Sequence, residues 1–458
     1  MSRPFWQHKA SLRTIENNVE SSSIKRIIIV CLAVLCVQFA RNYFNIAINL
    51  SIYTIIIAIG FLTRNETTRV AIIAYTIPFC NNLPMNEIVL AYVIIETLSN
   101  YGKLNIKYND LLIIVVLVIL ELINCLLINQ FPYRNILYLF LFFVATMQIS
   151  SHTYFLSSLK KIGLSLCLGT ISFGVLLFVV TVKQTSLSYV LAGGIRLGRT
   201  FELMTIGKLA SNPNSLAIYC VISLSILLML LPKKQIGLYL FICLSFACVF
   251  VGLLSQSRAF VVGVVLTVLL FSIFMFFSRK EKKKYLFLIA ITTAIFVMFF
   301  IANYAEMLGA LSDRFRVSDI TNGRFTIFNS YLNASLSNAR GIIFGYGLNT
   351  YKEALSQLTF LSNSAHNVLL EVYLSWGLIG IVLVIKWIYN QIKRQQTFLP
   401  RNIEKQKSIL TYLPIAALFI MLQSSRMFLT RTPLLLLGVC LLMIRIDTKE
   451  GQTDKRIN

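Results

Sequence analysis

Residues 364–380 read SAHNVLLEVYLSWGLIG, and this stretch carries both the fold class and the first candidate for chemistry. It begins in a long polar segment and continues into an apolar run that predicts a membrane-spanning helix. His366 and Gly377 are 11 residues apart, about three helical turns, so a continuous helix would place them on one face, close to Gly380. Small residues there would let a second helix pack closely beneath the imidazole. An imidazole at the water-exposed end of a span is a candidate acid–base group near neutral pH.

Apolar runs of this kind recur along the whole chain. Of its 458 residues, 57% are hydrophobic and only 13% are charged, which is typical of an integral membrane protein. The sequence predicts an all-α polytopic membrane protein with about 12–14 transmembrane helices in one integral domain, residues 1–458. The candidate spans are 24–40, 44–62, 70–82, 86–98, 111–128, 135–150, 162–182, 214–231, 236–254, 259–277, 285–302, 367–390, 409–425 and 432–446. The third and fourth, interrupted by Pro78 and Pro84, could instead form one re-entrant or kinked unit.

The distribution of charge predicts the orientation in the membrane. Residues 1–23 are polar and no small-residue cleavage site follows the first apolar run, so we expect a cytoplasmic tail rather than a removed signal peptide. Fourteen crossings place the second tail, 447–458, in the cytoplasm as well, and the inner segments then carry 28 of the 42 basic residues. The two long outer segments, 183–213 and 303–365, would form an extracytoplasmic cap, with a helix predicted over 324–336.

Missing motifs argue against several kinds of chemistry. All nine cysteines lie in apolar runs without a CxxC pair, so neither a disulfide nor a metal is implied. The outer loops hold no Asp-x-Asp pair and the short cytoplasmic loops hold no glycine-rich phosphate loop. The sequence therefore shows no motif that would bind a metal–diphosphate or support nucleotide hydrolysis. We expect no cofactor, no metal and no nucleic-acid partner.

Arginine usage differs between the two sides of the predicted topology. The outer segments hold 11 Arg and 3 Lys, whereas the inner segments hold 10 Arg and 18 Lys, which together make the 42 basic residues. The outer arginines are Arg41, Arg134, Arg196, Arg199, Arg258, Arg314, Arg316, Arg324, Arg340, Arg426 and Arg431. Because guanidinium grips phosphate or carboxylate oxygens with a planar fork of donors, this excess indicates an anionic ligand, a phosphate or diphosphate, on the outer face. About half of these arginines would instead pair with carboxylates or touch lipid headgroups.

Histidines and buried acids give the remaining candidates. His366 is the only histidine that faces outward in this topology, and one histidine without ligand-spaced partners cannot form a zinc site. It is either an acid–base group or a hydrogen-bonded structural residue. Glu87 and Glu96 lie close enough to span ends to reach water, whereas Glu121 and Glu371 lie deeper and are expected to pack against an arginine or a polar helix partner.

Several short motifs, in order, resemble the O-antigen ligase and O-antigen polymerase superfamily of bacterial envelope glycosyltransferases. The motif that carries most of the resemblance is His-Asn, nine residues, then Gly-x-x-Gly, present as His366-Asn367 and Gly377-Leu378-Ile379-Gly380. The others are Ser257-Arg258, Gly323-Arg324, Gly345-Tyr346-Gly347, and Asn212-Pro213-Asn214 after Arg196 and Arg199. Together they cover roughly residues 195–390.

The resemblance implies a metal-independent GT-C-like transferase in the bacterial cytoplasmic (inner) membrane. Its donor would be a glycan on undecaprenyl diphosphate at the outer leaflet, with membrane lipids and a chain-length regulator as possible partners. His366 would be the general base for the acceptor hydroxyl, and Asn367 would orient donor or acceptor. Arg258, with Arg196 or Arg199 or both and with Arg324 as a further candidate, would hold the diphosphate.

Three functions remain open from the sequence. The first is a polymerase that joins lipid-linked repeat units into O-antigen or capsular polysaccharide, and its nearest rival is a ligase that moves the finished glycan to lipid A-core or another acceptor. The third is a flippase or other transporter of lipid-linked oligosaccharide. Transporters place polar residues near the bilayer midplane, whereas the polar chemistry here gathers in loops on one side, which favours the enzymes.

Overall fold

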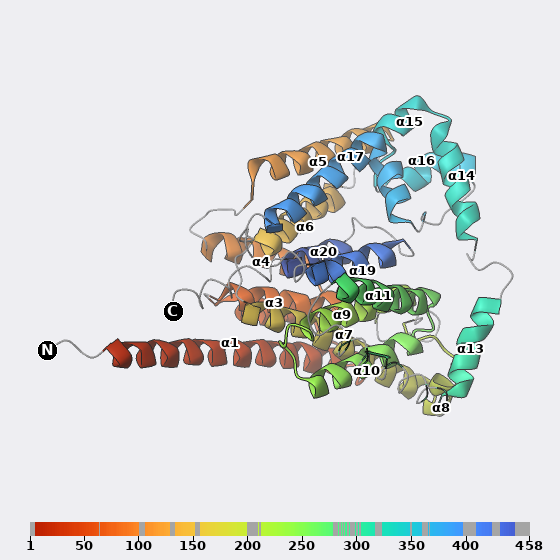
Figure 1. The fold of residues 1–458 in the computed structure, drawn as a ribbon. Helices are drawn as coiled ribbons and strands as arrows, with labels where there is room; N and C mark the ends of the chain where they lie inside the picture. The colour runs from red at the N-terminus through yellow and green to blue at the C-terminus, as the bar shows by residue number, and fades with distance from the viewer. Residues whose placement is uncertain are drawn as a thin grey trace.

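The fold is taken from a computed structural model of the chain. It describes residues 5–63, 65–99, 106–128, 133–151, 156–198, 209, 212–277, single residues between 283 and 301, 304–316, 323–348, 350–359, 365, 367–396, 409–423 and 431–444. Throughout these residues the regular structure is helical (Figure 1).

The helices follow the apolar runs of the sequence closely. Their bounds are α1 Phe5–Asn42, α2 Ser51–Phe61, α3 Glu66–Thr76, η1 Ile77–Phe79, α4 Met85–Ser99, α5 Tyr108–Leu127, α6 Tyr133–Ser151, α7 Leu156–Gln184, α8 Leu187–Leu191, α9 Pro213–Leu230, α10 Leu238–Leu254, α11 Arg258–Phe277, α13 Ala305–Arg316, α14 Arg324–Leu336, α15 Ala339–Phe344, α16 Tyr351–Thr359, α17 Val368–Gln396, η2 Ile409–Tyr412, α19 Leu413–Leu422 and α20 Arg431–Met443. The helix expected at 324–336 is α14. The span expected at 285–302 falls largely outside the described residues.

Seven of these helices are long and apolar enough to cross a membrane, and four shorter apolar helices accompany them within the part of the chain that the structure describes. The prediction of an all-α polytopic membrane protein is therefore confirmed. The core of the bundle is α9, of which 89% is buried, packed against α7, α10, α11 and α19. By contrast, only 28% of the apolar window of α11 is buried, so most of its surface is available to lipid.

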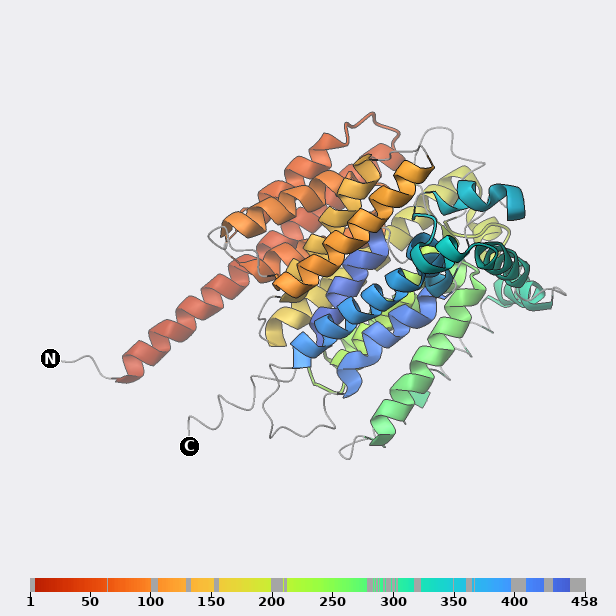
Figure 2. The same cartoon turned by 90° about the horizontal axis from the view of Figure 1, so that it is seen from above.

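The two ends of the bundle differ. The short helices α8 and α13 to α16 lie at one end, at the right in Figure 1, and α1 begins at the opposite end, where its first turns project beyond the other helices (Figures 1 and 2). We call α13 to α16 the cap. A small apolar cluster joins α14 and α16 of the cap to the first half of α17 through buried Tyr331, Tyr351, Leu370 and Leu374.

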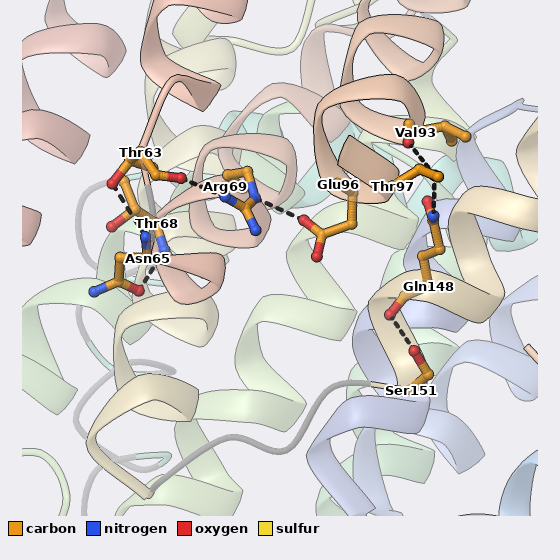
Figure 3. Close-up of polar contacts among 9 residues, drawn as sticks. All are labelled: Thr63, Asn65, Thr68, Arg69, Val93, Glu96, Thr97, Gln148 and Ser151. Carbon is orange, nitrogen blue, oxygen red and sulfur yellow. Dashed lines mark hydrogen bonds and ion pairs between the residues drawn. The ribbon is translucent and has the colours of Figure 1, made fainter. Parts of the chain in front are cut away.

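A buried ion pair joins the beginning of α3 to the end of α4 (Figure 3). Arg69, near the beginning of α3, donates from Nε to Glu96 Oε2, near the end of α4, at 2.6 Å, and the two side chains are 0% and 1% exposed. The expectation that Glu96 reaches water is therefore wrong, because a cation from the neighbouring helix holds it inside the protein. Residues 70–98 form parts of two short helices, α3 and α4, joined by η1 and a turn. Glu87, by contrast, is exposed.

Helix α17 is broken at Gly377, whose φ of 64° and ψ of −160° are not helical. His366 precedes the helix, which begins at Val368, so the expectation that His366 and Gly377 share one helical face is wrong. The close packing expected at Gly377 is present, although its partner is the end of α15. A Cβ on Gly377 would lie 2.3 Å from the carbonyl group of Ile343, and a Cβ on Gly380 would lie 2.2 Å from Trp376 Cβ.

The buried ion pair leads to a stability prediction. Glu96→Gln should lower the free energy of unfolding by about 3 kcal/mol, because Arg69 then keeps a buried charge without its counter-ion. The matched control is Glu87→Gln on the same helix, where an exposed carboxylate is lost and the change should stay within about 0.5 kcal/mol. Reversible unfolding in mixed detergent micelles measures both values, and equal losses for the two variants would contradict the prediction.

Candidate functional site

A tight turn between α10 and α11, residues 255–258, presents Arg258 as the first residue of α11. Ser255, Gln256 and Ser257 are each at most 2% exposed. Gln256 has a φ of 47°, a conformation that is uncommon for a residue other than glycine and that needs support from its surroundings. Its side-chain amide supplies that support by donating to the carbonyl oxygens of Gly193 at 2.8 Å and Ile195 at 3.4 Å.

The Asn-Pro-Asn motif at the start of α9 holds the other side of this turn. Asn212 caps α9, since its Oδ1 accepts from the backbone N–H of Asn214 at 2.8 Å, and Pro213 occupies the first helical position. Asn214 Oδ1 in turn accepts from the Ser257 hydroxyl at 2.8 Å. Residue 257, and with it the neighbouring Arg258, is therefore fixed to α9, the most buried of the seven candidate membrane spans.

Arg196 reaches the same turn from the segment that follows α8. Its Nε donates to the carbonyl oxygen of Ser255 at 3.3 Å, and the backbone N–H of Leu197 donates to the carbonyl oxygen of Leu254 at 2.9 Å. The side chain is half-buried. Arg196 and Arg258 thus flank one turn although 62 residues separate them in the sequence. Arg199, the other candidate from this segment, lies outside the described residues.

Arg324 comes to Arg258 from the cap. It is the first residue of α14 and follows Gly323, whose φ is 73°. Burial and the positive charge of Arg258 both lower the pKa of Arg324 from its ordinary value. The positive charge of Arg258 therefore acts on Arg324, the first residue of α14. Three of the arginines singled out in the sequence therefore gather at one end of the bundle.

Asn367 lies at the start of α17 and has two roles in the structure. Its Oδ1 accepts from the backbone N–H groups of Leu369 at 3.0 Å and Leu370 at 3.1 Å, which makes it the helix cap. Its Nδ2 donates to Gln423 Oε1 at 3.1 Å, just beyond α19. Helix α19 packs on α11 at Gly263, where a Cβ would lie 2.3 Å from Met421 Sδ. The start of α17 is therefore connected through α19 to the helix that carries Arg258.

His366, the proposed base, lies outside the described residues, although Ala365 and Asn367 on either side are described. Two other arginines from the predicted outer set have partners: Arg340 donates to Asn124 Oδ1 at 3.3 Å, and Arg134 lies over the Tyr133 ring at 5.8 Å. Within the described residues, no group of three or more His, Cys, Asp or Glu side chains is arranged to hold a metal ion.

Sequence reasoning missed three residues that build the site, namely Asn214, Gln256 and Gln423. Asn214 belongs to the Asn212-Pro213-Asn214 motif, which by itself does not indicate the hydrogen bond to Ser257. The positive φ of Gln256 and the contact of Gln423 depend on segments that are distant in the sequence, so no local pattern marks them. The arrangement links the turn that carries Arg258 to the start of α17 through α19, and its guanidinium donors are suited to holding an anionic group.

The capping role of Asn367 can be tested apart from any activity. Asn367→Ala should lower the free energy of unfolding by about 1 kcal/mol, because two N–H groups of α17 lose their acceptor. Asn367→Asp keeps a capping oxygen and should stay within about 0.5 kcal/mol of the wild type. Unfolding in mixed micelles measures both, and an equal loss in the two variants would count against the cap.

A comparison with known protein families matches the part of the chain that contains most of the site residues. A protein-family model described as O-antigen ligase matches residues 243–385, which contain Arg258, Arg324, Asn367 and the Gly377–Gly380 motif. No curated protein sequence matches the chain. Proteins of this family act on lipid-linked glycans, and the family implies a glycosyltransferase-like enzyme in general. The match covers 143 of the 458 residues, so it shows that this part of the chain is similar to the O-antigen ligase family.

Proposed function

We propose that the protein is a membrane glycosyltransferase that polymerises undecaprenyl-diphosphate-linked repeat units into O-antigen or capsular polysaccharide at the outer face of the cytoplasmic membrane. The observation that carries the proposal is the gathering of three arginines: Arg196 donates to the turn that presents Arg258, and the charge of Arg258 acts on Arg324 at the start of α14. Like charges repel one another, so a cluster of three half-buried arginines suits a ligand with several negative charges, such as a diphosphate.

In the proposed reaction, His366 takes the proton of an acceptor sugar hydroxyl, whose oxygen attacks the anomeric carbon of the donor glycan. The bond from that carbon to the diphosphate oxygen breaks, and the carrier diphosphate leaves with the electron pair. Arg258 and Arg196 face the charge that develops on this leaving group, and Arg324 adds to the same field. Asn367 holds the first turn of α17, next to the base in the sequence. The energy comes from the donor bond, so no nucleotide is consumed.

A ligase is the second candidate, because the matching family model carries that description. The chemistry at the anomeric carbon is the same, and only the acceptor differs. Deletion separates the two: loss of a polymerase leaves single repeats on the carrier, whereas loss of a ligase leaves long glycan on it. Purified protein that moves lipid-linked glycan across a vesicle bilayer, and transfers none, would instead favour a transporter.

The proposed sidedness can be tested with two glycines that have no neighbouring atom within 4 Å of a built Cβ, Gly309 in the cap and Gly237 before α10. A membrane-impermeant maleimide should label Gly309→Cys in intact spheroplasts and should label Gly237→Cys only after lysis. Open space at both sites makes the two cysteines comparable in reactivity. Labelling of Gly237→Cys alone in intact spheroplasts would place the cap in the cytoplasm and remove the proposal.

The proposed roles of His366 as the base and of Arg258 in holding the diphosphate predict the kinetics of variants. His366→Ala should lower kcat for transfer by about 100-fold or more, in keeping with the loss of a general base. Arg258→Ala should lower kcat by a similar factor, and Arg258→Lys should recover only part of it, because lysine lacks the planar fork. Arg134→Ala is the control, since this exposed arginine also lies at the cap end, and it should transfer at the wild-type rate. Wild-type transfer by His366→Ala would exclude His366 as the base.

A further inference from the structure

Glu121, on α5, is a buried carboxylate that joins three segments of the chain. Its Oε2 accepts from the backbone N–H of Leu348 at 2.6 Å, in the turn after α15, and from the indole N–H of Trp376 at 2.9 Å, in α17. Its Oε1 accepts from the Cys125 thiol at 3.7 Å. The residue is 0% exposed. The expectation of a polar helix partner is confirmed, and the partner includes the cap turn as well.

Asn124 lies three residues further along α5, on the same face of that helix. Its Nδ2 donates to the carbonyl oxygen of Phe344 at 3.1 Å and to that of Ser375 at 3.3 Å. The two α5 side chains therefore contact both partners of one junction, the end of α15 and the break in α17. We call Glu121 and Asn124 the α5 clamp.

The junction itself is made of backbone. The N–H of Tyr346 donates to the carbonyl oxygen of Leu374, and the N–H of Gly347 donates to that of Ser375, both at 2.8 Å. In an intact helix those carbonyls would accept from residues 378 and 379, but the break at Gly377 removes these partners. The cap turn replaces them, and the α5 clamp satisfies the neighbouring polar groups.

The break divides α17 into two halves with different neighbours. The first half packs in the cap cluster, through Leu370 and Leu374. The second half belongs to the membrane bundle, where Trp387 is fully buried and meets the Phe143 ring edge-on. The junction at Gly377 therefore sets how the cap, and the start of α17 with it, is placed on the bundle that carries Arg258.

We propose that Glu121 is a positioning residue for the transfer reaction, because it fixes the first half of α17 relative to the arginines of the 255–258 turn. The proposal rests on the proposed function for its kinetic consequence, although its geometric consequence stands alone. Without the carboxylate, the Leu348 N–H and the Trp376 indole lose their common acceptor, and the junction loosens while the turn that holds Arg258 stays anchored to α9 and to the segment around Ile195.

The chain offers a matched control at the other end of the same two helices. Asp110 of α5 is 2% exposed and accepts from Asn390 Nδ2 at 3.0 Å and Gln391 Nε2 at 2.8 Å, both on α17. It also is a buried carboxylate that joins α5 to α17, but it lies on the far side of the break from Asn367. A purely structural role would make Glu121→Leu and Asp110→Leu equivalent.

The first test measures steady-state transfer with a purified lipid-linked donor. Glu121→Leu should lower kcat by about 10- to 100-fold, as expected for a small displacement of a catalytic group, while the donor KM changes by less than about threefold because the arginine turn is untouched. Glu121→Gln keeps an acceptor oxygen and should remain within about threefold of the wild-type kcat. Asp110→Leu should keep the wild-type kcat. Equal losses of kcat in Glu121→Leu and Asp110→Leu would overturn the positioning role.

The second test needs no activity. Spin labels on Leu369→Cys, at the start of α17, and Val262→Cys, one turn into α11, report the distance between the two parts of the site, and both positions are exposed. The background replaces Cys31, Cys36 and Cys243, the three cysteines that are not buried, with alanine. Glu121→Leu should shift or broaden the distance distribution, whereas Glu121→Gln and Asp110→Leu should leave it unchanged. An unchanged distribution in Glu121→Leu would overturn the proposal even if kcat falls. If the wild-type protein transfers no glycan, the proposed function is wrong. If the distance distribution still changes in Glu121→Leu as expected, the role of Glu121 in placing the first half of α17 stands.

Discussion

The break in α17 depends on finding partners for backbone groups that lie away from water. Gly377 adopts a φ of 64°, so the carbonyls of Leu374 and Ser375 cannot accept from the next helical turn. In a membrane protein an unsatisfied backbone group costs several kcal/mol, and such a break survives only where protein groups replace the lost bonds. Here Tyr346 and Gly347, from the turn after α15, supply the donors. The placement of the cap on the bundle follows from this one requirement.

Both sides of this junction need glycine, for the same physical reason. A Cβ on Gly345 would lie 2.5 Å from the backbone of Ser375, and a Cβ on Gly377 would lie 2.3 Å from that of Ile343. Each residue also has a positive φ, which side chains rarely adopt. Two short glycine motifs, 32 residues apart in the sequence, are thus the two faces of a single contact. That contact lies inside the part of the chain that matches the O-antigen ligase family.

Three buried acids join separate segments of the chain. Glu96 pairs with Arg69 across α3 and α4, Asp110 receives two amides of α17, and Glu121 holds the cap turn and Trp376. Each of these carboxylates is at most 2% exposed and has at least one donor on another helix or turn. The arginines of the 255–258 turn differ, because their neighbours include other cations. The charge of Arg258 acting on Arg324 is what suits this part of the protein to an anionic ligand.

The sequence by itself determined the fold class and the placement of most helices, because about 20 consecutive apolar residues have few alternatives to a membrane-spanning helix. It also singled out Arg196, Arg258, Arg324 and Asn367, since arginine excess and short motifs are local properties. The tertiary structure alone decided that Glu96 is buried in an ion pair, that α17 breaks at Gly377, and that Gln256 holds the 255–258 turn to Gly193 and Ile195. Each of these depends on a hydrogen-bond or charge partner from a distant segment, and helical periodicity carries no information about which distant segment that will be.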